Sequence, residues 1–207
     1  KNTARRELAK RAESTTDSKE QEQIRRQAID IEDKAQKEMK KFGGQHKEAY
    51  KAMSSDERKA ISSYGKDDSY DMINAALRSG MPPPDTVRHL DAAIAKSKLP
   101  SDVVVHRGVS LDVLGGDPSK MVGKTFGDKG YVSTSLDGSV AEGFGGEKNA
   151  VVEIRVPKGS NGFAMNADKP DFPDEHEVLL PRDSKFKIVD AKQEGGRWRV
   201  TAELITK

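Results

Sequence analysis

Hydrophobic residues near the start of the chain recur at the spacing of a helix. Between Ile24 and Phe42 they follow one another at intervals of three or four residues, which predicts a narrow apolar stripe on one long helix. Asp17-x-x-Glu20 resembles a capping box before this stripe, and Gly43-Gly44 is expected to end the helix. We interpret residues 1–44 as a charged helical extension or linker. Two interpretations stay open: an arm that docks on a partner chain, and a helix packed on the domain that follows.

The next segment, residues 45–99, has the pattern of several short helices. Ser54-x-x-Glu57 is a second capping box, and Gly65 is expected to close the helix that it opens. Further helices are predicted to begin at Ser69 and at Asp85. After residue 99 the helical spacing ends.

The remaining chain consists of short apolar runs separated by turn residues, which predict strands. The runs are Val103–Val105, Tyr131–Ser135, Val151–Val156, Phe163–Met165, Val178–Leu180, Phe186–Val189 and Trp198–Leu204. Glu194-Gly195-Gly196 supplies a turn between the last two runs and predicts a final hairpin. Helices followed by six or seven strands, and not alternating with them, indicate an α+β fold with mostly antiparallel pairing.

Composition narrows the class of protein. The chain has 207 residues, 34% of them hydrophobic and 34% charged, which fits one large domain or one domain with an appendage. A net charge of only +2 does not favour nucleic acid as a partner, and no apolar run approaches the ~20 residues of a membrane span. The absence of cysteine excludes disulfides and thiolate metal sites. A first residue of Lys1, in place of Met, is expected for a fragment or a processed product.

Arg107 is the first candidate functional residue, because it follows the strongly apolar run Val103–Val105 closely. A buried arginine is costly unless an anion or a carboxylate meets it, and its planar guanidinium suits a phosphate held by two hydrogen bonds. The alternative interpretation is a structural ion pair.

Hydroxyl side chains form the second group of candidate functional residues. Ser133 and Ser135 are expected to share one face of a strand, with Thr134 on the other. Hydroxyls on an inward face need partners, and a carboxylate on a neighbouring strand is the natural one.

Two glutamates form the third group of candidate functional residues. Glu175 and Glu177 flank His176 directly before the run Val178–Leu180, so both acids are expected on one strand face with His176 opposite. Paired carboxylates at the mouth of a buried strand can move a proton and stabilise a positive charge. The alternative is a charged, solvated edge strand.

Other motifs are excluded. Gly143–Lys148 begins like a dinucleotide-binding loop but lacks the third glycine and precedes a strand. No phosphate-binding loop ending in Gly-Lys-Ser/Thr is present, and the four histidines lack the spacing of zinc ligands.

Taken in order, Arg107, Ser133-Thr134-Ser135 and Glu175-His176-Glu177 resemble the Arg, Ser-Thr-Ser, Glu-x-Glu signature of the mono-ADP-ribosyltransferase superfamily. The similarity is greatest to the arginine-specific, exoenzyme-type toxins, which include actin-modifying binary toxins and related phage and secreted effectors. It covers roughly residues 50–205. The resemblance implies N-terminal helices followed by a two-sheet, mostly antiparallel β-core, with residues 45–207 as the catalytic domain. It also implies NAD as the substrate, no metal, and transfer of ADP-ribose to an arginine of a target protein with release of nicotinamide.

The resemblance assigns catalytic roles to Glu177, Glu175 and Ser133. Glu177 matches the glutamate that stabilises the ribosyl cation formed when the nicotinamide–ribose bond breaks. Glu175 matches the upstream residue of the pair, which is Glu in arginine-directed members and usually Gln in asparagine-directed ones. It would orient the target guanidinium and help to remove its proton. Ser133 matches the serine that positions the catalytic glutamate.

The same resemblance implies the residues that bind NAD. Arg107 matches the arginine that holds an NAD phosphate. Tyr70 and Asn74 match residues of the helix that closes over NAD, although their spacing alone favours a boundary tyrosine and an exposed asparagine. Gly108, next to Arg107, is assigned to NAD binding as well, although some toxins have a second arginine there. Gly130 also departs from the pattern, since some toxins have an asparagine in its place.

Four further residues are assigned by resemblance. Thr134 and Ser135 would support the strand and line the nicotinamide pocket, and Phe144 would pack beside the nicotinamide ribose. Phe172 matches the aromatic residue that meets the target protein.

Alternatives to transfer remain open. The chain could be an NAD glycohydrolase with water as acceptor, or a non-catalytic binding module with the same fold. Actin is the target implied by the family, and the implied setting is a secreted bacterial or phage effector that acts in the target-cell cytoplasm. Residues 1–44 are expected to connect the catalytic domain to a partner chain or to the rest of a larger toxin, and their removal is expected to leave catalysis intact.

Overall fold

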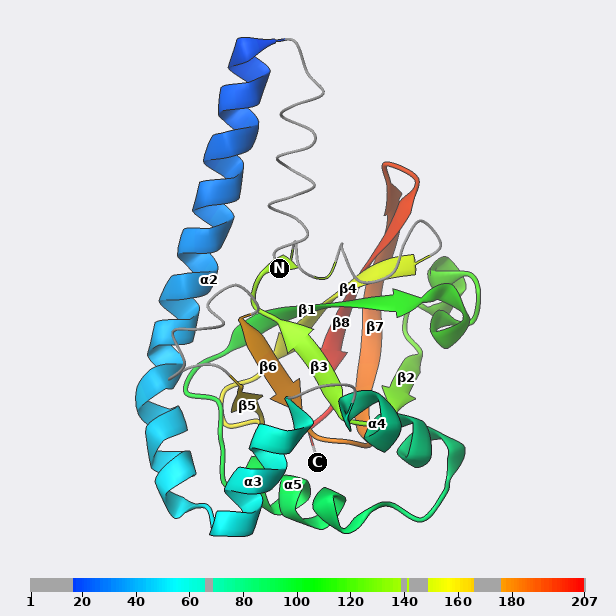
Figure 1. Cartoon of the computed structure of the whole chain (residues 1–207). Coiled ribbons are helices and arrows are strands. Elements are labelled where there is room, and N and C mark those ends of the chain that lie inside the picture. Colours follow the sequence, from blue (N-terminus) through cyan, green and yellow to red (C-terminus); the bar gives the residue numbers. More distant parts are fainter. Residues whose placement is uncertain (1–16, 66–68, 139–140, 142–148, 166–175, 207) are drawn as a thin grey trace.

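The computed structural model describes residues 17–65, 69–138, 141, 149–165 and 176–206. Helices come first and strands follow (Figure 1), which confirms the predicted α+β order. The helices are α2 (Ser18–Ala52), α3 (Ser55–Tyr64), α4 (Ser69–Ser79) and α5 (Asp85–Ala95), with the short 3-10 turns η1 (Leu111–Leu114) and η2 (Pro118–Met121). The strands are β1 (Val103–Ser110), β2 (Thr125–Asp128), β3 (Val132–Ser135), β4 (Asn149–Val156), β5 (Phe163–Ala164), β6 (Glu177–Leu180), β7 (Ser184–Glu194) and β8 (Arg197–Leu204).

Helix starts follow the capping signals. The Asp17 carboxylate accepts a hydrogen bond of 2.8 Å from the backbone N–H of Lys19 at the start of α2. Ser54 and Glu57 form both hydrogen bonds of a capping box at the start of α3, which Gly65 ends. These local signals need no tertiary partner, which is why the sequence is enough to predict them.

Helix α2 passes through Gly43-Gly44 without interruption and ends only at Ala52, so the predicted helix end at the glycines is wrong. Phe42 and Ala49, on either side of the glycines, are buried at 2% and 5% exposure. Each glycine costs a helix about 1 kcal/mol, and burial of the flanking side chains offsets that cost. The helix therefore crosses the proposed boundary at residue 44.

The eight strands that the structure describes form one hydrogen-bonded sheet in the order β2-β7-β8-β4-β1-β3-β6-β5. All neighbouring pairs are antiparallel except β4 and β8, which confirms a mostly antiparallel core. Strands β1 and β3 are joined by a single registered pair, His106 with Ser135. The two sheets expected from the resemblance are thus two groups of strands connected at this pair.

Strand β1 extends to Ser110, so Arg107 lies inside the strand. The position at the end of the strand, which the sequence suggested, is wrong. The predicted final hairpin is confirmed as β7 and β8. Within the described part of the chain, no helix is both long and apolar enough to cross a membrane.

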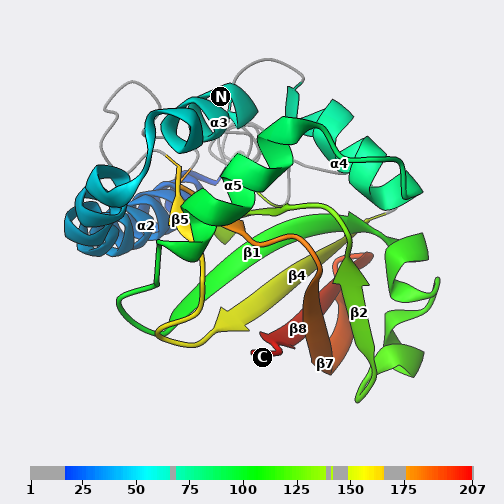
Figure 2. The ribbon, with the colours of Figure 1, turned by 90° about the horizontal axis from the view of Figure 1, so that it is seen from below.

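Buried side chains form two clusters on opposite faces of β3 and β6. Val132, Val178 and Leu180 belong to the first, which also takes residues of α2 and of the long strands. Leu179 belongs to the second, beneath α3, α4 and α5, which gather on one side of the strands in Figure 2. Because successive strand residues point to opposite faces, Glu177 shares the face of Leu179 and is directed toward these helices.

Candidate active site

Tyr64, the last residue of α3, is a buried group on which residues of all three sequence motifs act. Its side chain is buried at 2% exposure, and its phenolic oxygen accepts a hydrogen bond of 2.9 Å from the Asn74 amide nitrogen. The same hydroxyl is hydrogen-bonded to the Ser133 side chain. The charges of Arg107 and Glu177 both act on it. An arginine, a strand hydroxyl and a glutamate that lie far apart in sequence therefore all influence the pKa of one buried group.

The pKa of Tyr64 lies above its ordinary value. Burial is the largest cause, and the negative charge of Glu177 adds to it. Hydrogen bonds from Asn74 and Ser133 and the positive charge of Arg107 act in the opposite direction. Tyr64 is therefore a neutral phenol that can both donate and accept a hydrogen bond at neutral pH.

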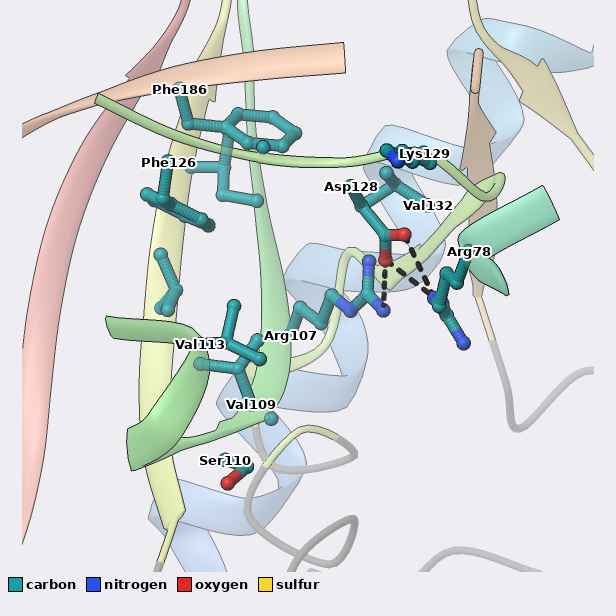
Figure 3. A pocket seen from close by; sticks show the side chains of 14 residues that line it. Arg78, Arg107, Val109, Ser110, Val113, Phe126, Asp128, Lys129, Val132 and Phe186 are labelled. Carbon is teal, nitrogen blue, oxygen red and sulfur yellow. Dashed lines mark hydrogen bonds and ion pairs between the residues drawn. The ribbon is translucent and has the colours of Figure 1, made fainter. Parts of the chain in front are cut away.

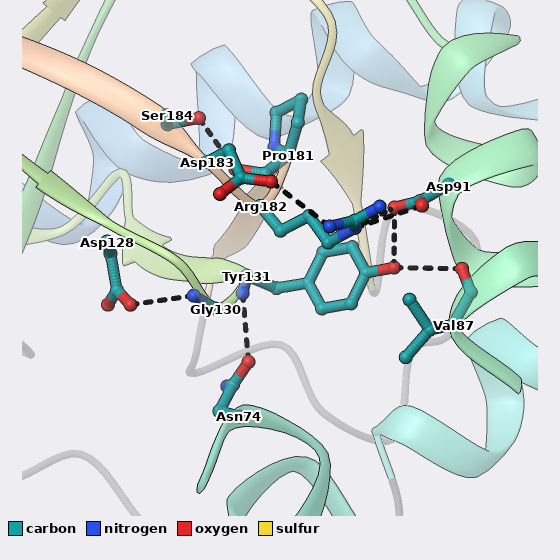
Figure 4. Close-up of polar contacts among 10 residues, drawn as sticks. All are labelled: Asn74, Val87, Asp91, Asp128, Gly130, Tyr131, Pro181, Arg182, Asp183 and Ser184. Carbon is teal, nitrogen blue, oxygen red and sulfur yellow. Dashed lines mark hydrogen bonds and ion pairs between the residues drawn. The ribbon is translucent and has the colours of Figure 1, made fainter. Parts of the chain in front are cut away.

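Asn74 is buried at 5% exposure, so the interpretation as an exposed asparagine is wrong. Its side-chain oxygen accepts a hydrogen bond of 2.8 Å from the backbone N–H of Tyr131, as Figure 4 shows. One amide thus connects α4 to Tyr64 and to the residue before β3. Tyr70 is 42% exposed, and its ring centroid lies 6.4 Å from that of Tyr64.

Gly130 is required by the position of Asn74. A Cβ atom at residue 130 would lie 2.6 Å from the Asn74 side-chain oxygen, closer than such contacts allow. An asparagine at residue 130, as in some toxins with these motifs, is incompatible with Asn74 where it lies here. Gly130, which departs from the motif of those toxins, therefore leaves the space that the Asn74 side chain occupies.

Tyr131 anchors the start of β3 from the other side (Figure 4). Its hydroxyl lies 2.7 Å from the Asp91 carboxylate and 3.0 Å from the Val87 carbonyl oxygen, both on α5. Arg182 donates to both oxygens of Asp91. Burial and the hydrogen bond to Asp91 raise the pKa of Tyr131, so this hydroxyl stays protonated and serves as a structural tie.

Strand β3 places its three hydroxyls differently. Thr134 donates a hydrogen bond of 2.6 Å to the Val178 carbonyl oxygen and so ties β3 to β6. The Ser135 hydroxyl accepts a hydrogen bond of 3.0 Å from the backbone N–H of Asp137. Ser135 is the residue directly opposite Glu177 in the strand pair. The hydrogen bond described for Ser133 goes to Tyr64, on which the charge of Glu177 also acts.

Arg107 forms an ion pair with Asp128, and Figure 3 shows a second arginine at the same carboxylate. The Arg107 Nη2 lies 3.0 Å from Asp128 Oδ2. Arg78 donates to the two oxygens of Asp128 at 2.9 and 2.8 Å. The backbone N–H of Gly130 adds a hydrogen bond of 2.8 Å. Arg78 was not recognised from the sequence, although it lies four residues after Asn74 on α4 and therefore on the same face.

The pKa shifts of Arg107 and Asp128 follow from burial and from their ion pairs, which include Arg78. Burial lowers the pKa of Arg107, while the Asp128 carboxylate opposes that change. Burial raises the pKa of Asp128, but the hydrogen bonds from Arg78 and Gly130 and the charges of the two arginines outweigh it and hold the pKa below its ordinary value. Two cations and one anion therefore leave a net positive charge at this end of the site.

A pocket of about 470 Å³ opens beside these arginines (Figure 3). Its polar side includes Arg78, Arg107, Asp128 and Lys129, and its other walls are Gly108, Val109, Ser110, Val113, Phe126, Gly127, Val132, Val152, Ile154 and Phe186. Gly108 lies in the lining, beside Arg107. Glu177 does not line this pocket. Glu177 and Arg107 are related through Tyr64, on whose pKa the charges of both act.

Three predicted site residues, Phe144, Phe172 and Glu175, lie outside the described residues. Among the residues that the structure does describe, no group of three or more acidic, histidine or cysteine side chains could hold a metal ion.

Tyr64 itself was missed in the sequence. A tyrosine on the apolar face of a short helix, directly before Gly65, is typical of a core residue. Only its contacts with Asn74 and Ser133 in the folded chain show its place in the site.

The sequence resembles known proteins over most of its length. The family model described as ADP-ribosyltransferase exoenzyme matches residues 39–207. Mono-ADP-ribosyltransferase C3 from Clostridium botulinum C phage is 29% identical over 181 residues, which cover 74% of this chain and 71% of that protein. NAD(+)--arginine ADP-ribosyltransferase EFV from Enterococcus faecalis is 32% identical over 107 residues, which cover 49% of this chain and only 21% of EFV.

Solved structures show the same fold. Plx2a, an ADP-ribosyltransferase toxin from Paenibacillus larvae, superposes with a TM-score of 0.69 at 25% identity and covers 83% of this chain and 96% of its own. A C3-type ADP-ribosyltransferase from Clostridium botulinum gives 0.65 at 27% identity, over 82% and 96% of the two chains. The C3 exoenzyme from Clostridium limosum gives 0.67 at 24% identity, over 83% and 95%, a likeness of fold.

Proposed function

The chain belongs to the family of ADP-ribosyltransferase exoenzymes, and from this premise we propose that it transfers ADP-ribose from NAD to an arginine of a target protein. The observation that supports this most directly is that Ser133 and the charges of Arg107 and Glu177 all act on the buried Tyr64 hydroxyl. In this proposal Arg107 supplies a cation for the phosphates, and Glu177 supplies a carboxylate for the ribosyl cation of the same bound dinucleotide.

The pyrophosphate of NAD binds at Arg107 and Arg78. Guanidinium groups form charge-assisted hydrogen bonds with phosphate oxygens, which are stronger than neutral ones. The two arginines already share one anion, Asp128, in hydrogen bonds of 2.8 to 3.0 Å. The two guanidinium groups therefore lie close enough together to bind one small anionic group at the same time.

The adenosine end of NAD occupies the pocket beside these arginines. Its volume of about 470 Å³ lies within the range of small-molecule sites. Phe126, Phe186 and Val113 give it apolar walls that suit a flat heteroaromatic ring. Arg78 and Arg107 belong to the same lining, which matches a base attached to a phosphate.

The nicotinamide ribose then lies toward Glu177. The bond between ribose C1′ and the nicotinamide nitrogen breaks, and its electron pair leaves with nicotinamide. The Glu177 carboxylate stabilises the ribosyl cation, an effect that is strong in a site shielded from water. A nitrogen of the target guanidinium bonds to C1′ and releases a proton, which Glu175 accepts.

Arginine as the acceptor is supported by two observations. Glu175 and Glu177 form the Glu-x-Glu pair of the arginine-directed toxins that the motifs resemble. A relative that is 32% identical over about half of this chain is named an NAD–arginine ADP-ribosyltransferase. Actin is the first target to test, since the same group of toxins includes actin-modifying ones, and with actin as the target the reaction takes place in the cytoplasm of a target cell.

Incubation of the chain with NAD labelled in the adenylate part, together with a cell lysate, tests the proposal. Label on a protein that hydroxylamine removes supports an arginine linkage, and mass spectrometry identifies the target. Free ADP-ribose without labelled protein supports an NAD glycohydrolase instead. No turnover of NAD, in the presence or absence of lysate, contradicts both reactions and leaves a binding module.

A further inference from the structure

His176 has an unusual backbone conformation directly before Glu177. Its φ angle is +41°, in the left-handed region that residues other than glycine seldom adopt. The side chain is buried at 3% exposure. Such a conformation costs on the order of 1 kcal/mol or more and persists only where the surroundings hold it.

Two contacts hold His176 in this conformation. Its ring Nε2 lies 3.1 Å from the side-chain Oε1 of Gln36 on α2, 140 residues earlier in the chain. Because Oε1 is an acceptor, the ring N–H donates. The backbone carbonyl of His176 accepts a hydrogen bond of 3.0 Å from the N–H of Leu136, just after β3. The residue is therefore fixed from α2 through its side chain and from β3 through its backbone.

This position sets the direction of Glu177. Glu177 is the first residue of β6, and its side chain faces the α3–α4 side of the sheet, opposite to Val178. His176 lies directly before β6 and is held by α2 and by the backbone after β3, so it fixes the point at which the strand, and with it the Glu177 side chain, begins. A rotation at residue 176 would turn the Glu177 carboxylate away from that hydroxyl.

We propose that Gln36 is a positioning residue for catalysis: through its hydrogen bond to His176 it fixes the start of β6 and thereby the direction of the Glu177 carboxylate. The proposal rests on the catalytic role proposed for Glu177. It makes the N-terminal helix α2 part of the framework of the active site, although Gln36 touches neither NAD nor the reacting atoms.

Gln36→Ala tests the proposal without threatening the fold, because Gln36 is an exposed helix residue and alanine favours helices. We expect kcat for NAD turnover to fall about tenfold or more, since a misplaced catalytic group costs far more in kcat than in binding, while KM for NAD stays within about twofold. Gln36→Glu retains an acceptor oxygen and should restore kcat. Gln23→Ala, an exposed glutamine on the same helix, serves as the matched control and should behave as wild type.

Variants of His176 separate the side-chain contact from the backbone. His176→Gly and His176→Asn both tolerate a positive φ, but neither side chain spans the distance to Gln36. Each should lower kcat as Gln36→Ala does, and the double variant with Gln36→Ala should lose no more than either single one. Should glycine prevent folding, the asparagine variant gives the same comparison.

The outcomes distinguish the two proposals. If wild type turns over NAD and Gln36→Ala lowers only the melting temperature, with kcat and KM unchanged, Gln36 is structural and the inference is wrong. Additive losses in the double variant contradict it as well. If wild type does not turn over NAD at all, the proposed function fails, and the positioning role fails with it.

Discussion

The side-chain nitrogen of Asn74 donates a hydrogen bond of 2.9 Å to the phenolic oxygen of Tyr64. This bond joins two helices at a buried point that Ser133 also reaches and on which the charges of Glu177 and Arg107 act. Asn74 accepts in turn from the backbone of Tyr131, at 2.8 Å. A short chain of hydrogen bonds thus connects the helices to the strand with the Ser-Thr-Ser motif, and it gives the proposed active site its geometry.

Replacement of Tyr64 by phenylalanine should damage activity more than folding. The ring and its packing remain, but the Asn74 amide and the Ser133 hydroxyl lose their common partner. A buried group left without a partner costs about 1–3 kcal/mol, so the melting temperature should fall moderately while kcat for NAD turnover falls about tenfold or more. Tyr50→Phe, a partly buried tyrosine on α2, is the control. Unchanged kcat in Tyr64→Phe would show that the hydroxyl is only structural.

Glu177→Gln should abolish both transfer to protein and hydrolysis of NAD. Glutamine keeps the size of the side chain but removes the charge that stabilises the ribosyl cation. Release of nicotinamide, measured with and without target protein, checks this. Substantial hydrolysis by the variant would show that another group stabilises the cation.

Glu175→Gln should separate the two reactions. If Glu175 accepts the proton of the target guanidinium, its loss removes transfer but spares part of the hydrolysis, because attack by water involves no guanidinium proton. The ratio of free to protein-bound ADP-ribose is the measurement. Equal loss of both products would assign Glu175 and Glu177 to one role.

Arg78→Ala and Arg107→Ala should weaken the binding of NAD. Each removes charge-assisted hydrogen bonds to the pyrophosphate, so KM should rise about tenfold or more. Arg107→Ala should also lower stability, because it removes a partly buried ion-pair partner of Asp128. Arg88→Ala, at an exposed position on α5, matches the change in charge and should leave KM unaltered. A KM equal to that of wild type in both variants would place the pyrophosphate elsewhere.

Asp128 should make the folded protein sensitive to acid. Its pKa lies below the ordinary value of 3.8, because the hydrogen bonds and charges of its partners outweigh burial. A carboxyl group with a lowered pKa stabilises the fold above its unfolded pKa, and this stabilisation is lost as the pH falls through the folded pKa. The free energy of unfolding, measured with urea between pH 7 and pH 2 (a span of about five units), should therefore depend less on pH in Asp128→Asn than in the wild type below about pH 4. Parallel curves would contradict this assignment.

Truncation tests the role of the N-terminal helix. The sequence suggested that residues 1–44 can be removed without loss of catalysis. Phe42, at 2% exposure, and Ala35, at 3%, belong however to the first buried cluster. Loss of a buried phenylalanine costs about 3–5 kcal/mol, so a chain that begins at residue 45 should have a clearly lower melting temperature than one that begins at residue 35. Equal melting temperatures and activity would support residues 1–44 as a separable extension.

Much of the fold follows from local signals in the sequence. Asp17, the capping box at Ser54 and the Gly195-Gly196 turn need only their near neighbours to act, and all three mark element boundaries where expected. The order of helices and strands, and the family, follow from such signals and from three short motifs. These are properties of neighbouring residues, so the sequence alone determines them.

The tertiary structure decided what depends on residues far apart in the chain. The glycines at residues 43 and 44 lie within a continuous helix because burial on either side outweighs their low propensity. Asn74 is buried because its partners, Tyr64 and Tyr131, come from other elements. The contact of Gln36 with His176 spans 140 residues, and no local pattern predicts it. Spacing along a chain fixes which side chains share a face, whereas only packing fixes which faces meet.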